Sequence, residues 1–183
     1  MVLLKVIYGI LYHSCNHHLY DLILSIFPGN YFCGFLFAEP ADIVIASAGG
    51  FPKDINLYQA QKAIDNARRA VRPGGILILV AACPEGLGDE AFTRWIAAAQ
   101  KPEDLIARIH TNFELGGHKA AAIAMVLKDI QIYLVSSLPE QVVQQVFVEP
   151  FTSLPEAYNR ALGEIGPEAK VLLIPQAGSV LPV

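Results

Sequence analysis

Apolar residues follow two alternating patterns along this chain from residue 41 onward. Short, mainly apolar runs occur at 42–48 (DIVIASA), 76–82 (ILILVAA), 130–137 (IQIYLVSS) and 169–175 (AKVLLIP), with a shorter one in VFVEP. ILILVAA is unbroken, which is typical of a strand buried on both faces of a sheet. Each run is therefore predicted to form a strand.

The segments between these runs carry apolar residues at helical spacing. INLYQAQKAIDNARRAV (55–71) is the longest, and RPGG follows it with the stop signals Pro73 and Gly74. Its apolar stripe consists of Leu57, Ala60, Ile64, Ala67 and Val71. Shorter helices are predicted for DEAFTRWIAAA, PEDLIARI, GGHKAAAIAMVLKD, PEQVVQQV and SLPEAYNRALGEI, the last with Ser153 as its N-cap. Alternating strands and helices predict an α/β fold, with an open, mostly parallel sheet covered by helices on both faces in a three-layer, Rossmann-like arrangement.

The first 40 residues depart from this pattern and form an irregular apolar segment. Leu19–Phe37 is long enough to suggest a membrane span, but it contains Asp21, Pro28, Gly29 and Asn30, which a span tolerates poorly. The segment is also a poor match to a signal peptide. We therefore expect no membrane association, a cytoplasmic location, and two parts: residues 1–40 and an α/β domain at 41–183.

Composition narrows the possible partners. Hydrophobic residues make up 54% of the 183 residues, the net charge is −4, and no Lys/Arg tract occurs, which argues against nucleic acid as a partner. Three scattered cysteines fit a reducing compartment. HSCNHH (13–18) contains His13, Cys15, His17 and His18, but no second ligand cluster follows, so a metal site is not favoured there.

Polar loops follow four of the predicted strands. In open α/β sheets, ligands bind at the carboxyl ends of the strands. Those ends carry Ser47-Ala-Gly-Gly, Cys83-Pro-Glu-Gly, Ser136-Ser137 and Pro175-Gln-Ala-Gly. The stretch PKDINLYQAQKA (52–63) comes directly after the first, which makes it the best candidate for a site.

Three side chains at the start of this helix suit a small acid. Tyr58, Gln59 and Lys62 are three and four residues apart and share adjoining parts of one helix surface. A helix start also offers free N–H groups and a positive dipole end. Together they fit a small carboxylate with a neighbouring hydroxyl. Two plainer interpretations stay open: Gln59 completing a capping box with Asn56, and Lys62 as a solvated lysine.

The segment 41–96 resembles the C-terminal domain of the nickel-pincer-dependent lactate racemase family. Its core, GGxPKDxNLYQAQKA, is long and specific, and FELGGHKAAAIAMVL (113–127) followed by IQIYLVSSL fits the same domain. The resemblance implies an isomerase, a racemase or epimerase of 2-hydroxy acids. It implies that Tyr58, Gln59 and Lys62 hold the substrate. His118 stands where the family has a tryptophan, which implies a substrate other than lactate, unless His118 only packs locally at its helix start.

The same resemblance implies that an important part is absent from this chain. The family's N-terminal domain carries the nickel-pincer nucleotide and the histidines that move protons, and residues 1–40 show no match to it. We therefore expect no cofactor bound by this chain, no activity of the chain alone, a small 2-hydroxy acid as ligand, and a separate cofactor-bearing domain as possible partner. The alternative is a non-catalytic small-carboxylate-binding or remnant domain. A methyltransferase or dinucleotide-binding function is disfavoured because SAGGFPKD lacks the required glycine spacing.

Overall fold

Five parallel strands form the central sheet. They are β2 (Ala41–Ser47), β3 (Val71–Val80), β4 (Gln131–Val135), β5 (Glu149–Phe151) and β6 (Val171–Ile174), in the spatial order β5-β4-β3-β2-β6. All four neighbouring pairs are parallel, so each connection crosses from one end of the sheet to the other. The predicted α/β class and parallel sheet are confirmed.

The structure is a computed structural model and describes residues 34–35, 39–179 and 181–182. The chain divides into two compact units, Met1–Cys33 and Gly34–Val183, and the description below concerns the second. A short parallel pair, β1 (Gly34–Phe35) with β7 (Leu181–Pro182), also belongs to this unit. The predictions for the segment 1–33, including the histidines of HSCNHH, lie outside the described residues.

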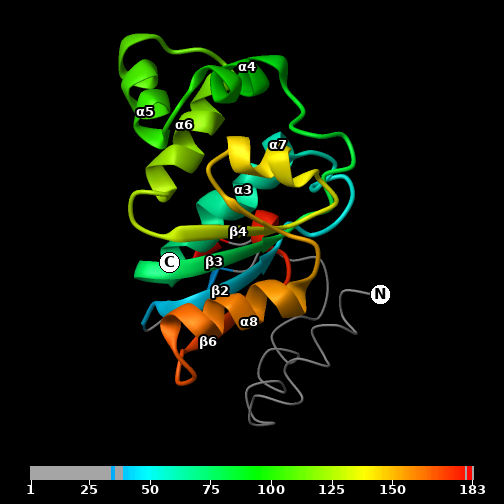
Figure 1. Cartoon of the computed structure of the whole chain (residues 1–183), viewed down its shortest axis with the longest axis vertical. Helices are drawn as coiled ribbons and strands as arrows, with labels where there is room; N and C mark the ends of the chain where they lie inside the picture. The colour runs from blue at the N-terminus through cyan, green and yellow to red at the C-terminus, as the bar shows by residue number, and fades with distance from the viewer. Residues whose placement is uncertain (1–33, 36–38, 180, 183) are drawn as a thin grey trace. The chain divides into compact units, whose positions relative to one another are not determined.

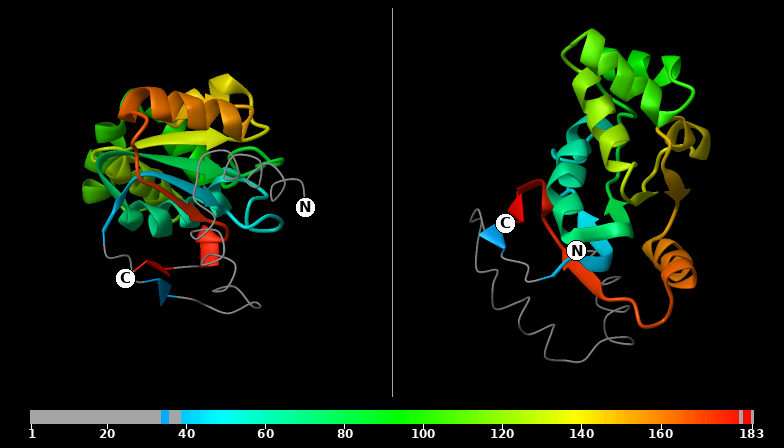
Figure 2. Two further views of the ribbon diagram at one scale, coloured as in Figure 1. Left: turned by 90° about the horizontal axis from the view of Figure 1, so that it is seen from below. Right: turned by 90° about the vertical axis from the view of Figure 1, so that its left-hand side faces the viewer.

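Helices cover both faces of the sheet (Figures 1 and 2). α8 (Leu154–Ile165) packs on one face against β3, β4 and β5. α3 (Leu57–Ala67) packs on the other face against β2 and β3 and is itself covered by α6 (Gly117–Val126). α4 (Glu90–Ala98) and α5 (Pro102–Thr111) pack on α6, and α7 (Glu140–Gln145) lies beside β5. Crossovers on opposite faces give the three layers that the alternating pattern predicted.

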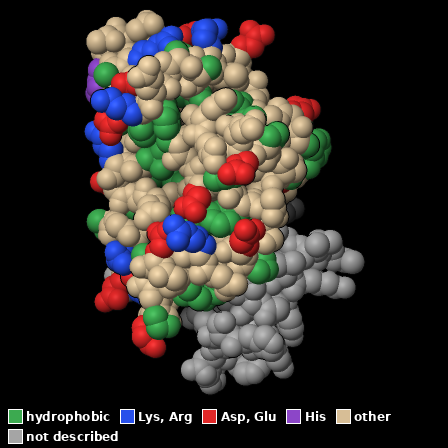
Figure 3. Space-filling model, viewed as in Figure 1, with side chains coloured by type: hydrophobic (Ala, Val, Ile, Leu, Met, Phe, Trp, Pro, Cys, Tyr) green, Lys and Arg blue, Asp and Glu red, His purple; other side chains and the backbone are tan. Residues whose placement is uncertain are grey.

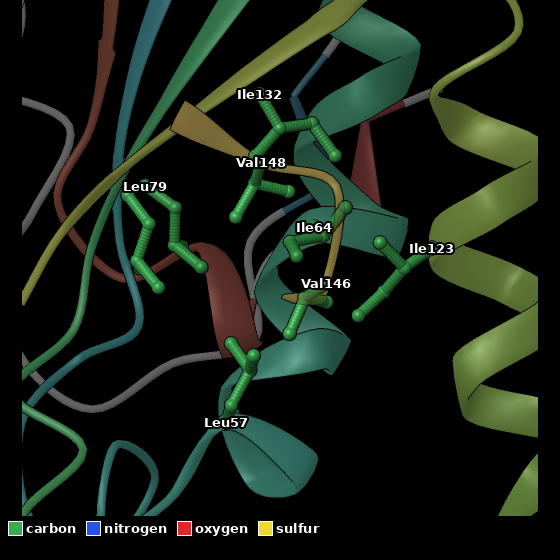
Figure 4. Close-up of a pocket in the computed structure, with 8 residues that line it drawn as sticks. Leu57, Ile64, Leu79, Ile123, Ile132, Val146 and Val148 are labelled. Atoms are coloured by element: carbon green, nitrogen blue, oxygen red, sulfur yellow. The ribbon is translucent and has the colours of Figure 1, made fainter. Parts of the chain in front are cut away.

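Aliphatic side chains fill the space between the sheet and α3. Figure 4 shows this region, where the tightly closed interior gap is lined by Leu57, Ile64, Leu79, Ile123, Ile132, Leu134, Val146 and Val148. Most of these side chains are buried. Burial of this kind contributes roughly 1.5–3 kcal/mol for each large aliphatic side chain. The core therefore holds the start of α3 at a fixed height above the sheet.

The end of the first helix differs from the prediction. α3 stops at Ala67, a 3₁₀ turn covers Arg68–Ala70, and the RPGG segment belongs to β3 instead of a turn. The reason is a register shift: Ala41 pairs with Val71 but Ile43 pairs with Ile76. The extra residues are accommodated by Gly74, whose φ of 72° suits glycine, and the Gly74 N–H donates to Asp129 O.

The VFVEP prediction is also shifted. The strand begins only at Glu149 and ends at Phe151, while Val146 and Val148 are buried in the core below α3. Val146 caps the end of α7, so its apolar side chain serves packing instead of strand pairing.

Two further features concern the surface charges and the length of the helices. On the face seen in Figure 3, acidic and basic side chains are interspersed. In the described part of the chain, no helix combines the length and apolar character needed to cross a bilayer.

Candidate functional site

The loop from Gly49 to Asn56, called the anchoring loop below, is bonded to neighbouring loops through its polar groups. The Asp54 carboxylate accepts the Ala82 N–H at 3.2 Å, and the Asp54 carbonyl accepts the Cys83 N–H at 2.8 Å. The Lys53 ammonium donates to Ser179 Oγ at 2.5 Å. These bonds join the loop after β2 to the loops after β3 and β6. Lys53 and Asp54 therefore have structural partners at the carboxyl edge of the sheet.

Asn56 is the N-cap of α3. Its Oδ1 accepts the Gln59 N–H at 3.0 Å, as a cap should. The Leu57 N–H donates to Gly86 O, the Tyr58 N–H to Leu87 O, and the Ala60 N–H to Asn56 O. The expectation of free N–H groups at this helix start is therefore wrong, because the loop after β3 supplies acceptors that sequence spacing does not reveal. Any ligand here must be held by side chains.

Tyr58, Gln59 and Lys62 lie on the outer part of α3. Gln59 and Lys62 are exposed and Tyr58 is half-buried, with its ring edge-on to Phe92 at 5.8 Å between centroids. In the described residues, the Gln59 and Lys62 side chains have no recorded hydrogen bond. Lys62 lies near enough to Lys119 of α6 for its charge to lower the pKa of Lys119. Gln59 and Lys62 therefore face solvent, whereas the Tyr58 ring packs against its neighbours.

The start of α6 packs tightly on Trp95. A Cβ added to Gly117 would collide with the indole of Trp95, and one added to Gly116 would collide with the Asp89 carboxylate. Trp95 is fully buried and donates from Nε1 to Glu114 Oε2 at 2.6 Å. That bond is the main reason why the pKa of Glu114 is lowered, and Arg94 contributes as an ion-pair partner. The two glycines thus allow the close approach that fixes the residues after them.

His118 and Lys119 follow these glycines. The Gly116 N–H donates to His118 Nδ1 at 3.1 Å, so a neutral imidazole carries its proton on Nε2. Local packing at the helix start, one of the two interpretations of His118, is present, and Nε2 keeps a donor for a ligand. Lys119 Nζ donates to Tyr58 O at 2.8 Å and lies 4.0 Å from the centroid of the Tyr58 ring.

The loop after β3 contributes backbone rather than reactive side chains. Cys83 is buried, with a φ of 52°, and burial together with the charge of Asp54 raises the pKa of its thiol to about 12. Such a thiol is a poor nucleophile. The Glu85 side chain is exposed, and its N–H donates to Ile55 O. Within the described residues, no group of three or more His, Cys, Asp or Glu side chains is arranged to hold a metal ion.

The crevice between β2 and β6 is occupied by the chain itself. The strands β2 to β5 follow one another in one direction across the sheet and β6 lies on the other side of β2, and open sheets commonly bind ligands at such a switch in strand order. Here the 3₁₀ turn Ala177–Ser179 packs against α3, and the Asn66 amide donates to Ala177 O at 2.7 Å. Gly178 lies so close to Ala48 O that a Cβ would be 2.9 Å away. The junction of α3 and α6, where Gln59 and Lys62 are exposed, is a separate polar surface.

The starts of α3, α4 and α6 meet at this junction. Gly88 touches the Asn56 amide, Asp89 caps α4 and touches Gly116, and Lys119 bonds to Tyr58. The ammonium groups of Lys62 and Lys119 lie near each other, with Asp65 and Asp89 nearby. The side chains of Tyr58, Gln59 and Lys62 supply the O–H and N–H donors of this surface, and such donors suit an anion such as a carboxylate.

The fold and the site together define a class of protein: a parallel α/β domain that carries hydrogen-bond donors where α3 and α6 meet, near the carboxyl edge of its sheet. The chain matches the lactate racemase C-terminal domain over residues 36–182 and belongs to that family.

Two similar proteins agree with this membership. The chain is 32% identical over 149 residues to a lactate racemase of Thermoanaerobacterium thermosaccharolyticum and 30% identical over 149 residues to one of Lactiplantibacillus plantarum. Each match covers 79% of this chain and 35% of the relative. The chain thus spans about a third of the length of the curated relatives it matches.

Solved structures show the same fold. The lactate racemase apoprotein from T. thermosaccharolyticum superposes with a TM-score of 0.75 at 32% identity, over 80% of this chain and 36% of the other. A Thermotoga maritima protein superposes with a TM-score of 0.54 at 15% identity, over 81% of this chain and 38% of the other, which shows similarity of fold alone.

Proposed function

We propose that this chain binds a small 2-hydroxy acid at the α3–α6 junction and serves as the substrate-binding part of a racemase or epimerase. The observation that carries the proposal is the exposed pair Gln59 and Lys62 beside Tyr58, whose side chains have no hydrogen bond within the described residues, whereas Lys53 and Asp54 of the same motif are bonded to neighbouring loops. Family membership supports it, since two relatives are named lactate racemases.

The proposed roles follow from the chemistry of each side chain. The Lys62 ammonium pairs with the substrate carboxylate, the Gln59 amide donates to the same carboxylate or to the hydroxyl, and the Tyr58 hydroxyl bonds the C2 hydroxyl region. A charge-assisted hydrogen bond contributes roughly 1.5–3 kcal/mol. With ordering costs subtracted, a few such bonds give affinities of about micromolar to millimolar. His118 Nε2 is proposed to contact the distal part of the acid and so to set substrate preference.

The chain alone is proposed to bind without racemising. The nickel-pincer nucleotide implied by the resemblance belongs, in this proposal, to the part of the relatives that this chain does not align with. The described residues offer no fitting ligand set, so no chemical step is assigned here to a metal. The partner in the full reaction is proposed to be that cofactor-bearing part, in the same or a separate polypeptide. The setting is proposed to be cytoplasmic.

Titration of the chain with a panel of 2-hydroxy acids, by calorimetry or chemical shift, tests the proposal. We expect saturable binding that Lys62→Ala weakens about 10- to 100-fold, because one charge-assisted bond is lost. Stability should change by less than about 0.5 kcal/mol, since Lys62 is exposed. Lys128→Ala is the matched control, because Lys128 is an exposed lysine at the far end of α6.

The outcomes separate the two candidate functions. Binding of 2-hydroxy acids that fails for the matching acids without a hydroxyl supports the substrate-binding function. Equal binding of both sets points to a general carboxylate-binding or remnant domain instead. If Lys62→Ala and Lys128→Ala change the affinity for the acid equally, the binding site does not lie on α3.

A further inference from the structure

The Lys119 ammonium contacts Tyr58 twice, once at its backbone carbonyl and once at its ring. Its Nζ donates to the Tyr58 backbone carbonyl at 2.8 Å and lies 4.0 Å from the Tyr58 ring centroid. The ring of Phe92 meets the Tyr58 ring nearly edge-on, at an interplanar angle of 71°. Both the backbone and the ring of Tyr58 are thus held by fixed neighbours. This contrasts with Gln59 and Lys62, which are exposed.

The groups around Lys119 favour interaction of its ammonium with the protein itself instead of with a ligand. The groups that act on its charge are Lys62 and Asp65 on α3 and Asp89 at the start of α4, while Tyr58 lies against it and His118 precedes it. Burial is the main cause that lowers the pKa of Lys119, and Lys62 lowers it further. Asp65 and Asp89 act in the opposite direction and favour the ammonium form. The two half-buried carboxylates only partly counteract burial and Lys62, so the pKa of Lys119 stays below its usual value.

The backbone that carries Lys119 has little room to move. Gly116 and Gly117 pack so closely on Asp89 and Trp95 that neither position accepts a Cβ. Trp95 is in turn held by Glu114 and stacked under the guanidinium of Arg108, 4.3 Å from the ring centroid. A side chain on such a rigid segment can hold its neighbour in one orientation.

From these contacts we infer that Lys119 is a positioning residue, which aims the Tyr58 hydroxyl at the bound acid and does not contact the acid itself. The inference rests on the proposed function, because it assigns a purpose to the orientation of Tyr58. The two neighbouring lysines then have separate roles. The Lys62 ammonium pairs with the ligand carboxylate, and the Lys119 ammonium contacts Tyr58 within the protein.

A double-mutant cycle tests this role, with the 2-hydroxy acid of the panel that the wild-type chain binds most tightly as the probe. Lys119→Met keeps the aliphatic stem but removes the ammonium, and we expect it to weaken binding of that acid about tenfold through loss of one hydrogen bond and one cation–π contact. Lys119→Arg keeps a cation over the ring and should restore binding to within about threefold of the wild-type chain. In a Tyr58→Phe background, which lacks the hydroxyl to be aimed, Lys119→Met should change binding less than about twofold.

Each outcome decides one point. A tenfold loss that persists in the Tyr58→Phe background overturns the inference, because Lys119 then acts on the acid directly or on the fold as a whole. If the wild-type chain binds no acid of the panel, the proposed function fails. The positioning of Tyr58 is then decided without ligand, from the NMR signals of its ring. Signals that move in Lys119→Met and return in Lys119→Arg support positioning, and signals unchanged in Lys119→Met overturn it.

Discussion

The anchoring loop (Gly49–Asn56) and the outer face of α3 adjoin each other in one motif, yet they use their polar residues differently. In the loop, Lys53, Asp54 and Asn56 all bond to other parts of the protein. On the helix, Gln59 and Lys62 are exposed. The density of polar residues in PKDINLYQAQKA therefore has two causes, one of them structural. A motif that marks a site can be devoted largely to holding the site's backbone in place.

Among the substitutions that test the structural role of the anchoring loop, we expect the largest loss of stability at Gly88, which packs against Asn56. Its φ is 95°, and an added Cβ would lie 2.5 Å from the Asn56 amide carbon. Gly88→Ala should therefore destabilise the fold by roughly 1–3 kcal/mol through overpacking and backbone strain. The free energy of urea unfolding measures this change.

Gly163→Ala is the matched control for Gly88→Ala. Gly163 lies within α8, and a Cβ there would meet nothing within 4 Å. Because alanine favours helix more than glycine, the control should stabilise by up to about 1 kcal/mol. Equal effects of the two substitutions would show that the contact between Gly88 and Asn56 is unimportant.

A smaller effect is expected from removing the helix cap. Asn56→Ala removes the acceptor of the Gln59 N–H and should cost about 1 kcal/mol. Gln59→Ala, three residues further on, should change stability by less than about 0.5 kcal/mol because its side chain is exposed. Thermal unfolding of both variants measures the two effects. A larger drop in unfolding temperature for Gln59→Ala than for Asn56→Ala would contradict the contrast between the loop and the helix face.

The smallest effect concerns a bonded charge at the opposite edge of the sheet. The hydrogen bond from Arg72 lowers the pKa of Asp42, and the Lys170 N–H adds to it. Because the pKa is lower in the folded than in the unfolded chain, the stabilisation is present above the unfolded value of about 3.9 and is lost as pH falls through the folded value. Both side chains are partly exposed, so the contribution is at most about 1 kcal/mol.

Urea unfolding at several pH values measures the Asp42 contribution. Asp42→Asn should be less stable than wild type at neutral pH, and the difference should shrink toward zero in acid. Glu168→Gln serves as a control, since Glu168 is exposed and has no recorded ion pair among the described residues. A difference for Asp42→Asn that stays constant with pH would contradict the assigned cause.

The sequence was sufficient for the parallel sheet because mainly apolar runs alternate with segments of helical spacing, and this alternation is typical of parallel strands joined by helices. It failed at RPGG, where proline and glycine signal a stop but here fill a register shift within β3. Asn56 was predicted as a possible cap from its side chain. The acceptors for the Leu57 and Tyr58 N–H groups were not predictable, because they are backbone carbonyls of Gly86 and Leu87.

The role of Lys119 shows what sequence spacing misses at the site. It is 61 residues from Tyr58, and only the packing of α6 on α3 brings the two together. The sequence shows Gly116 and Gly117 as a glycine pair before a helix. It does not show why glycine is needed there, because the reason for Gly117 is its close packing on Trp95 of α4. The roles assigned to Tyr58, Gln59, Lys62 and His118 toward a ligand stay predictions.

The bonding of the first α3 amides inside the protein has a consequence for divergence. Since the first N–H groups of that helix are bonded within the protein, the proposed recognition of an acid rests on a few side chains, of which Gln59 and Lys62 are exposed. If the proposed function holds, descendants of such a domain can exchange Gln59, Lys62 or His118 and acquire a preference for another acid while the anchoring loop stays the same. Shared loop residues in two such proteins are then evidence of common ancestry, and say little about a common substrate.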